Sequence, residues 1–364
     1  MLSPDIQYAV LYNTLLILVT IIFFKYKGNN VPFDTSNIPG LILIIFLILI
    51  IGIRDWISPK FGDSAAYGIY FRYALTPQSV WYAKSKFFGY LYYYWHSFGL
   101  GPDLFFLVSA AFYCLPVYFL SKCLSKPYGA FLFILFFACS FGWYSFATNG
   151  IRNGWGFSML IWSLLAIYNK KYLISILCII LAWCIHGSTM IAIGGMIASL
   201  LYHNPKKAFY IWLICLLLSF VLGRVFQEYF ATFDFVASDG GGYLTGSLSN
   251  NAESFSRTGF RWDFVLFSVV PIIWGINCLT KLESLGKTDI FYNFILCTYC
   301  YANAVWVLAI RANYSNRLAQ VSWWMIPILI AYPIFRMDIF RSKCDTLASV
   351  LVIYYAFTYI MYIR

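Results

Sequence analysis

Length and composition place this chain among membrane proteins. Of its 364 residues, 62% are hydrophobic, 21% are aromatic and only 11% are charged, which excludes an ordinary soluble globular domain. The net charge of +11 would suggest nucleic-acid binding in a soluble protein, but membrane topology and anionic ligands explain it here, and nothing else in the sequence favours nucleic acid.

Apolar runs predict an all-α protein with about 12 transmembrane helices in one integral domain over residues 1–364. Such a chain has little room left for a separate soluble domain. Its first run lacks a basic segment and a small-residue cleavage site, so we expect a span and not a removed signal peptide. The predicted spans are 8–24, 38–53, 102–121, 128–147, 151–168, 172–185, 188–202, 208–223, 262–279, 290–310, 318–335 and 345–363.

The apolar stretch 172–202 allows two interpretations, either one long tilted helix or a helical hairpin that turns at His186 and Gly187. The distribution of basic residues decides between them. With the hairpin, the loops on one side of the membrane collect most lysines, whereas a single helix would scatter them. We therefore expect the hairpin, with both chain termini on the outer side.

The basic residues separate by kind between the two predicted sides. The lysine-rich side, which the positive-inside rule assigns to the cytoplasm, has Lys25, Lys27, Lys122, Lys126, Lys170, Lys171, Lys206, Lys207, Lys281, Lys287, Arg336, Arg341 and Lys343. The other side has Arg54, Lys60, Arg72, Lys84, Lys86, Arg152, Arg224, Arg257, Arg261, Arg311, Arg317 and Arg364. Arginines on the outer side oppose the topology rule. Because a guanidinium binds phosphate or carboxylate through paired hydrogen bonds, they indicate an anionic ligand there.

Two long segments, 54–101 and 224–261, are expected to face outward. The first is too polar to span a membrane and too aromatic for a free loop, so it predicts an amphipathic or re-entrant segment at the interface. Its Tyr and Trp rings fit an interfacial belt or sugar stacking. The second, rich in Gly, Ser and Asn, is either a solvated connector or a mobile lid over a site.

Several outward residues are candidates for a functional site. Arg152 begins a span, where the helix dipole and free backbone N–H groups also attract anions. His186 ends a predicted helix on the same face and either has a structural role or acts as a hydrogen-bonding group or base. The other candidates are two arginine pairs at the ends of outer segments, Arg257 with Arg261 and Arg311 with Arg317.

Ten cysteines allow a disulfide, a metal or a buried-thiol interpretation. Most lie inside apolar runs, which favours small buried side chains. Cys297 and Cys300 form a C-x-x-C pair, but it lies within a predicted helix and has no second ligand pair. Since the outer acidic residues are also dispersed, the sequence predicts no metal site.

Four short motifs follow one another along the chain: Arg54 followed by Gly62, Asp63 and Tyr67, then NGIRN at 149–153, then His186 with Gly187 and Ser188, and finally the segment from Arg311 to Arg317. Their order resembles the EpsG-like and Wzy-type polymerases of bacterial surface polysaccharides. The resemblance covers most of the chain. In that family a glutamine is common where this chain has the shorter amide of Asn153.

The resemblance implies a GT-C-like glycosyltransferase in the bacterial inner membrane, with its active site facing the periplasm or the cell exterior. Both substrates would be glycans linked to undecaprenyl pyrophosphate, joined with inversion and without cofactor or metal. It leaves open whether a chain-length regulator binds. On this hypothesis Arg152, His186 and Asp63 are catalytic, with Glu253 a weaker base candidate. Substrate binding falls to Arg54, Tyr67, Asn153, Arg257, Arg261, Arg311 and Arg317.

Two other classes fit parts of the pattern. A flippase or transporter of lipid-linked glycans would also favour arginines, but along a transmembrane path and often with internal repeats, whereas the charges here concentrate at one face. A membrane O-acyltransferase also has an intramembrane histidine, although its acyl donor comes from the inner face. Polymerase is therefore the first hypothesis.

Overall fold

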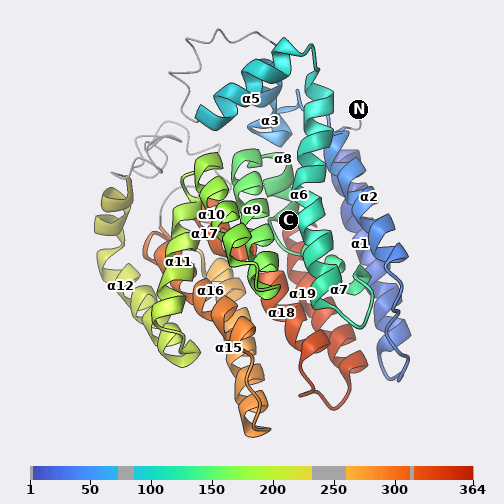
Figure 1. The fold of residues 1–364 in the computed structure, drawn as a ribbon, viewed down its shortest axis with the longest axis vertical. Coiled ribbons are helices and arrows are strands. Elements are labelled where there is room, and N and C mark those ends of the chain that lie inside the picture. Colours follow the sequence, from blue (N-terminus) through green and yellow to red (C-terminus); the bar gives the residue numbers. More distant parts are fainter. Residues whose placement is uncertain (1–2, 73–85, 232–259, 312–314, 364) are drawn as a thin grey trace. The chain divides into compact units, whose positions relative to one another are not determined.

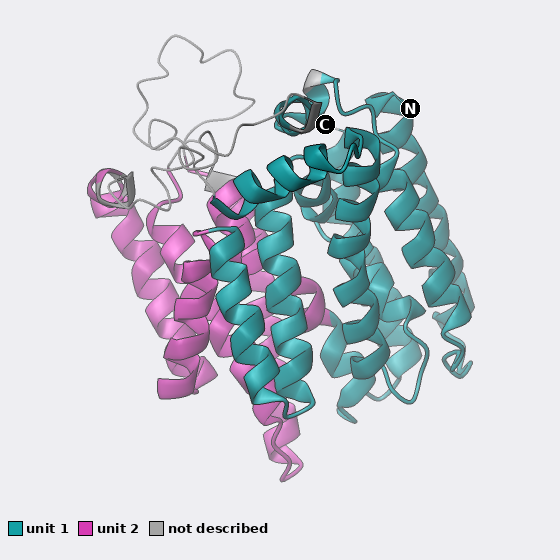
Figure 2. Ribbon diagram, turned by 45° about the horizontal axis from the view of Figure 1, so that its top comes forward, with its two compact units in different colours: residues 1–186, 331–364 teal, residues 187–330 magenta. Residues whose placement is uncertain are grey.

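The computed structural model describes residues 3–72, 86–231, 260–311 and 315–363, which form helices and connecting segments without a strand (Figure 1). The predicted all-α class is confirmed for these residues. The chain divides into two compact units, which are coloured separately in Figure 2. Unit 1 comprises residues 1–186 and 331–364, and unit 2 comprises residues 187–330.

The helices of unit 1 are α1 (Pro4–Tyr26), α2 (Ile38–Gly52), the short 3₁₀ helix η1 (Pro59–Phe61), α3 (Ser64–Arg72), α5 (Lys86–Ser97), α6 (Pro102–Leu124), α7 (Phe131–Ala138), α8 (Trp143–Thr148), α9 (Ile151–Tyr168), α10 (Tyr172–Ile185) and α19 (Lys343–Ile363). Unit 2 has α11 (Thr189–Leu201), α12 (Pro205–Ala231), α15 (Trp262–Ser284), α16 (Ile290–Leu308) and α17 (Ser315–Trp323). The unit boundary falls within α18 (Ile326–Arg336). Local chemistry explains several helix starts, because α1 and α6 begin with a proline and then an aspartate, which suit the first turn.

Seven described segments are long and apolar enough to cross a membrane. Three further helices, α2, α10 and α11, are apolar but shorter. Length and composition therefore support a polytopic membrane protein, whereas twelve as the number of spans and the GT-C-like architecture stay predictions. The seven segments are Pro4–Tyr26, Pro102–Leu124, Pro205–Gly223, Trp262–Ser284, Ile290–Leu308, Arg317–Arg336 and Lys343–Ile363.

Two stretches that we expected to be continuous helices are each divided in two. The stretch 128–147 forms α7 and α8, because the chain turns at Gly142, whose φ of +80° disfavours a residue with a Cβ. The stretch 318–335 forms α17 and α18, and Pro327 lies in the first turn of α18, where its missing N–H loses no hydrogen bond. The predicted break near His186 is confirmed, since α10 ends at Ile185 and α11 begins at Thr189.

The two long outer segments differ from one another. The segment 54–101 contains η1, α3 and α5, and α5 buries Phe88 and Tyr92 while it exposes Tyr90 and Tyr94. The segment therefore contains a helix with one buried side, whereas its place at the membrane interface stays a prediction. The other segment was expected to begin at 224, but α12 continues to Ala231. The rest of that prediction, the lid over 232–259 with Glu253 and Arg257, lies outside the described residues.

Side-chain hydrogen bonds join the helices of unit 1. The indole of Trp155 in α9 donates to Ser109 of α6 (2.7 Å), and this bond fixes how the two apolar helices are aligned along their axes. Ser163 of α9 and Ser175 of α10 share a hydrogen bond of 2.8 Å. Hydrogen bonds of this kind are favourable between membrane helices because lipid offers no alternative partner.

In unit 2 a buried polar network surrounds Asn303 of α16. The Asn303 side chain accepts from the indole of Trp212 in α12 (2.7 Å) and donates to Ser322 of α17 (2.8 Å). Ser268 of α15 accepts from the indole of Trp323 (2.8 Å). Four helices thus meet at one satisfied network, which fixes their register in an otherwise apolar unit.

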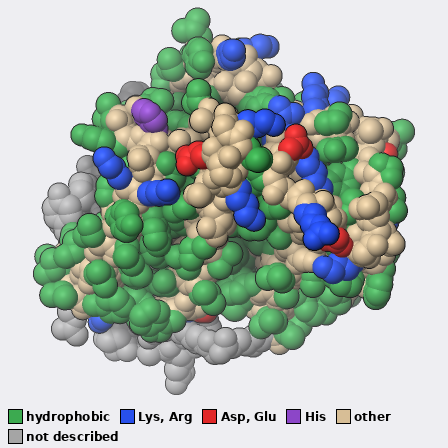
Figure 3. Space-filling view, turned by 90° about the horizontal axis from the view of Figure 1, so that it is seen from below, with side chains coloured by type: hydrophobic (Ala, Val, Ile, Leu, Met, Phe, Trp, Pro, Cys, Tyr) green, Lys and Arg blue, Asp and Glu red, His purple; other side chains and the backbone are tan. Residues whose placement is uncertain are grey.

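The predicted separation of lysines from arginines is present along the helices of unit 1. Trp56, which follows α2, donates to Asp103 at the start of α6 (2.9 Å), whereas Cys123 at the end of α6 contacts Asn169 at the end of α9. Arg54 and Arg152 therefore lie at one end of the helices. The opposite, lysine-rich end holds Lys25, Lys27, Lys122, Lys126, Lys170, Lys171 and Arg336. Figure 3 shows Lys and Arg side chains gathered on the face seen from below.

Candidate functional site

Arg54 is a buried cation immediately beyond α2. Its side chain is 1% exposed and donates from Nε to Ser64 Oγ (3.0 Å) and from Nη1 to the carbonyl oxygen of Ile51 (2.7 Å). The guanidinium also lies over the ring of Phe106, 4.3 Å from its centroid. Burial lowers the pKa of Arg54 from 12.5 to about 9, which leaves it charged at neutral pH. Arg54 is therefore buried and bonded to protein groups, and its predicted role in substrate binding stays a prediction.

Two contacts join the segment around Asp63 to the junction between α8 and α9. Ser64 Oγ donates to the carbonyl oxygen of Thr148, and the backbone N–H of Asp63 donates to Asn149 Oδ1 (2.9 Å). The residues of each pair are more than 80 positions apart in the chain. The first resemblance motif, which begins at Arg54, and the NGIRN motif are therefore parts of one structure.

Gly62 allows this junction to close. Its φ is +53°, and a Cβ built there would lie 2.4 Å from Asn149 Oδ1. We expect Gly62→Ala to destabilise the protein by about 1–3 kcal/mol, because it adds strain in the left-handed region and displaces the Asn149 amide. Thermal unfolding of the purified protein in detergent measures this.

Gly286→Ala is the matched control for that substitution. Gly286 has a similar φ of +68°, but a Cβ there would meet nothing within 4 Å. The control carries the backbone strain without the collision, so it should unfold at a higher temperature than Gly62→Ala. Equal unfolding temperatures would contradict the proposed steric role of Gly62.

Arg152 lies in the first turn of α9 and contacts α3. Its Nε donates to the hydroxyl of Tyr67 (3.1 Å), and its side chain is half-buried. The ring of Tyr67 also packs against Tyr92. Burial raises the pKa of Tyr92, so its hydroxyl stays neutral. Asn153 follows Arg152 in the same turn and is also half-buried. The α3–α9 cluster is our name for Arg54, Asp63, Ser64, Tyr67, Thr148, Asn149 and Arg152.

His186 lies at the same end of the α9–α10 pair as Arg152. The helices are antiparallel, because residues 169–171 alone connect them and Ser163 bonds Ser175 across the pair. Arg152 precedes Ser163 by eleven residues and His186 follows Ser175 by eleven, so both lie about 16 Å from that bond. Eleven residues turn a helix through three full turns plus about 20°, so Arg152 faces nearly the same way as Ser163, and His186 nearly the same way as Ser175. Both therefore lie near the line of contact between the two helices, which we call the α9–α10 seam. His186 is buried there, with 8% of its surface exposed.

In unit 2, Arg261 is engaged by an acidic partner. Its Nε and Nη2 donate to the two carboxylate oxygens of Asp263 (2.9 and 2.7 Å), and the guanidinium lies 3.8 Å over the ring of Phe264. An anionic ligand would have to compete with this carboxylate. Binding of an anionic ligand by Arg261 stays a prediction, and it would require the loss of the bonds to Asp263.

The remaining predicted arginines differ in exposure. Arg311 is exposed, lies 6.0 Å over the ring of Phe260 and packs against Gly223 of α12. Arg317 lies half-buried in α17. Arg257 lies outside the described residues. The α3–α9 cluster with His186 belongs to unit 1 and these arginines belong to unit 2, so the predicted ring of outward arginines stays a prediction.

The C-x-x-C pair of α16 lies in the apolar interior. Cys297 and Cys300 are both free thiols with 0% exposure, which confirms the buried-thiol interpretation for these two. Among the residues that the structure describes, no group of three or more His, Cys, Asp or Glu side chains is placed to hold a metal ion.

Sequence reasoning did not single out the residues that hold the α3–α9 cluster together. Asn149 lay within the NGIRN motif, so a signal for it existed. Ser64 offered none, because its hydroxyl acts only by bridging Arg54 and the carbonyl of Thr148, 84 residues away. Such a bridge depends on tertiary packing and leaves no local pattern.

Comparison with known proteins places this arrangement in a family. No curated protein and no solved structure matches the chain. The model of the EpsG family matches residues 37–364, a range that includes the α3–α9 cluster and His186. This range covers nearly the whole chain, and two of the motifs that resembled this family, the one that begins at Arg54 and NGIRN at 149–153, meet in the α3–α9 cluster. The chain belongs to the EpsG family.

Proposed function

We propose that the protein polymerises lipid-linked oligosaccharide repeat units. Membership of the EpsG family suggests a role in exopolysaccharide biosynthesis. In the proposed reaction the growing glycan is transferred from an undecaprenyl-pyrophosphate donor to a lipid-linked acceptor unit at the outer face of the bacterial inner membrane. The observation that carries the proposal is the α3–α9 cluster, in which a half-buried arginine at a helix start donates to Tyr67, Tyr67 packs against Tyr92, and the backbone of Asp63 is bonded to Asn149.

The proposed step is a direct displacement with inversion. A hydroxyl oxygen of the acceptor sugar attacks the anomeric carbon of the donor glycan, and the bond from that carbon to the pyrophosphate oxygen breaks. The hydroxyl proton passes to a base, and the lipid pyrophosphate leaves with the bonding electron pair. Negative charge therefore grows on the pyrophosphate, where a fixed cation stabilises the transition state more than the ground state.

Arg152 is the residue best placed for that cation. The hydroxyl of Tyr67 accepts from Nε and so orients the guanidinium, while the start of α9 adds the positive end of its dipole. His186, at the same end of the α9–α10 seam, is the leading base. Asp63 is the alternative base, since its backbone is held by Asn149. Tyr67 and Asn153 would contact the glycan or the phosphates.

Arg54 has a different role in this proposal. Because it is buried and bonded to Ser64 and Ile51, it acts as a positioning residue that holds α3 against the α8–α9 junction. Arg257, Arg261, Arg311 and Arg317 remain proposed binders of phosphate.

Arg54→Met is expected to lower kcat about 10- to 100-fold with little change in KM for the lipid-linked unit. Loss of the buried fork shifts the cluster by a fraction of an ångström to an ångström, which costs rate more than binding. Arg54→Lys should recover little, because the single ammonium lacks the planar fork whose Nε and Nη1 reach the two partners. Steady-state kinetics in proteoliposomes measure both constants, with exposed Arg341→Met as control. A rise in KM alone would show that Arg54 binds substrate directly.

Reconstitution with a purified lipid-linked repeat unit tests the proposed function. Ladders of increasing glycan length would support polymerisation. Movement of intact lipid-linked units across the vesicle membrane without ladders would identify a transporter, and acyl transfer would identify an O-acyltransferase. Either of these results would overturn the proposal.

A further inference from the structure

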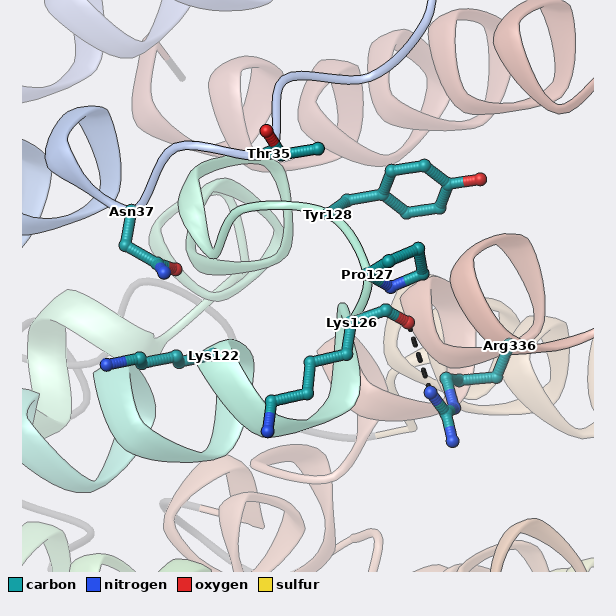
Figure 4. Close-up of a pocket in the computed structure, with 7 residues that line it drawn as sticks. All are labelled: Thr35, Asn37, Lys122, Lys126, Pro127, Tyr128 and Arg336. Carbon is teal, nitrogen blue, oxygen red and sulfur yellow. Dashed lines mark hydrogen bonds between the residues drawn. The ribbon is translucent and has the colours of Figure 1, made fainter.

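A cavity of about 470 Å³ opens at the lysine-rich end of unit 1, at the opposite end of the helices from the α3–α9 cluster. The segment before α2, the end of α6 and the end of α18 contribute to it. Figure 4 shows its three cations along one side of the opening, below the segment 35–37 and Tyr128. Its lining residues are Thr35, Asn37, Lys122, Lys126, Pro127, Tyr128 and Arg336.

The positive charge of this cavity is not neutralised by the described residues. Lys122, Lys126 and Arg336 are exposed and make no ion pair within the described ranges. The nearby acidic residues have other partners, because Asp338 pairs with Lys343 (2.7 Å) and the Asp34 carboxylate accepts from the backbone of Ser36 (2.9 Å). Three cations around one opening favour an anion of more than one charged oxygen.

Arg336 is held in place toward this opening. Its Nη1 donates to the carbonyl oxygen of Lys126 (3.0 Å), and its guanidinium lies 5.8 Å over the ring of Tyr168. This is its one hydrogen bond among the described residues, so the other guanidinium N–H groups can donate to a ligand. Asn37 and Thr35 add uncharged polar groups to the lining.

An apolar track leads along α6 to the same cavity. Leu104, Val108, Leu115 and Phe119 are each about two-fifths exposed. At 100° per residue these positions and Lys122 fall within one stripe about 60° wide. The stripe therefore ends at a cation of the cavity. A ligand that uses both surfaces has an anionic head and a hydrocarbon tail.

We propose that this cavity binds the phosphate-bearing headgroup of an anionic phospholipid, with an acyl chain along the exposed stripe of α6. Basic pockets between membrane helices hold such headgroups through several lysines and arginines, each contributing to binding. Free phosphate would use the cations but not the stripe. This site is separate from the proposed polymerase chemistry and does not depend on it.

Native mass spectrometry of the full-length protein in detergent tests the proposal, with phosphatidylglycerol and phosphatidylcholine added in parallel. The wild type should retain phosphatidylglycerol preferentially. The triple variant Lys122→Ala, Lys126→Ala, Arg336→Ala should weaken that binding on the order of a hundredfold. Circular dichroism and unfolding temperature establish that the variant is folded.

Lys206→Ala, Lys207→Ala and Lys281→Ala together form the matched control, because they remove the same charge from exposed positions that do not line the cavity. This variant should bind phosphatidylglycerol like the wild type. An equal loss in the control would overturn the proposal, as would equal binding of phosphatidylcholine. Soluble glycerol phosphate is the third probe, and binding of it as tight as that of the lipid would assign the cavity to free phosphate.

Discussion

Replacing Arg152 by Ala is expected to abolish polymer while single repeat units remain on their lipid carrier. The guanidinium is proposed to meet charge that appears on the pyrophosphate only as the glycosidic bond breaks. Removing one such preorganised donor lowers the rate about 100- to 1,000-fold. Gel analysis of lipid-linked glycans formed in proteoliposomes measures the loss, because single units and long chains separate by length.

Three variants sharpen this result. Arg152→Lys keeps the charge but loses the planar fork, so it should give short chains at a reduced rate. Tyr67→Phe removes the hydroxyl that accepts from Arg152 Nε and should cost less than Arg152→Ala, because the charge remains. Arg341→Ala removes an exposed arginine from the segment between α18 and α19 and should make normal chains. Normal long chains from folded Arg152→Ala protein would remove Arg152 from the mechanism.

Replacing His186 by Ala is expected to lower the polymerisation rate about 100- to 10,000-fold. In the proposed step the imidazole takes the proton of the attacking sugar hydroxyl, so its loss slows formation of the glycosidic bond. Initial rates with saturating lipid-linked unit measure the loss.

His203→Ala is the matched control for that experiment. His203 is exposed in the short connection between α11 and α12 and has no place in the proposed site. Its replacement should leave the rate unchanged. A His186→Ala protein with the wild-type rate would refute the base assignment.

The arrangement of unit 1 separates two kinds of basic chemistry along the helices. The arginine end has cations that are buried or half-buried and oriented by hydrogen bonds, as Arg54 and Arg152 are. The lysine-rich end has exposed cations around a cavity. Fixed cations suit a reacting pyrophosphate, whereas exposed ones suit a membrane lipid whose headgroup stays mobile.

Sequence patterns predicted where most helices lie, but they did not predict where a helix is broken or how far it continues. Apolar runs located α6, α9 and α10 within a few residues, because burial in lipid depends on local composition. They did not reveal the break at Gly142, since a single glycine inside an apolar run is also common within membrane helices. They ended the span of α12 at 223, which agrees with the candidate span Pro205–Gly223. They did not show that the helix continues to Ala231, because its last turns are polar enough to be taken for a loop.

For the site, the residue types were predictable and most of their contacts were not. The motifs with Arg54, Asp63 and Arg152 were found from spacing and resemblance alone. Their meeting depends on Ser64 and Asn149, whose roles exist only after α3 has packed on the α8–α9 junction.

By itself, the amino-acid sequence determined the helical membrane class, the approximate helix positions and the separation of lysines from arginines. These properties follow from local composition and from the cost of placing charge in lipid. Only the tertiary structure decided that Arg54 is buried, that Arg152 contacts Tyr67 and that Asn149 holds the backbone of Asp63. The reason is geometric, since each residue turns a helix by 100° and packing alone selects which faces meet.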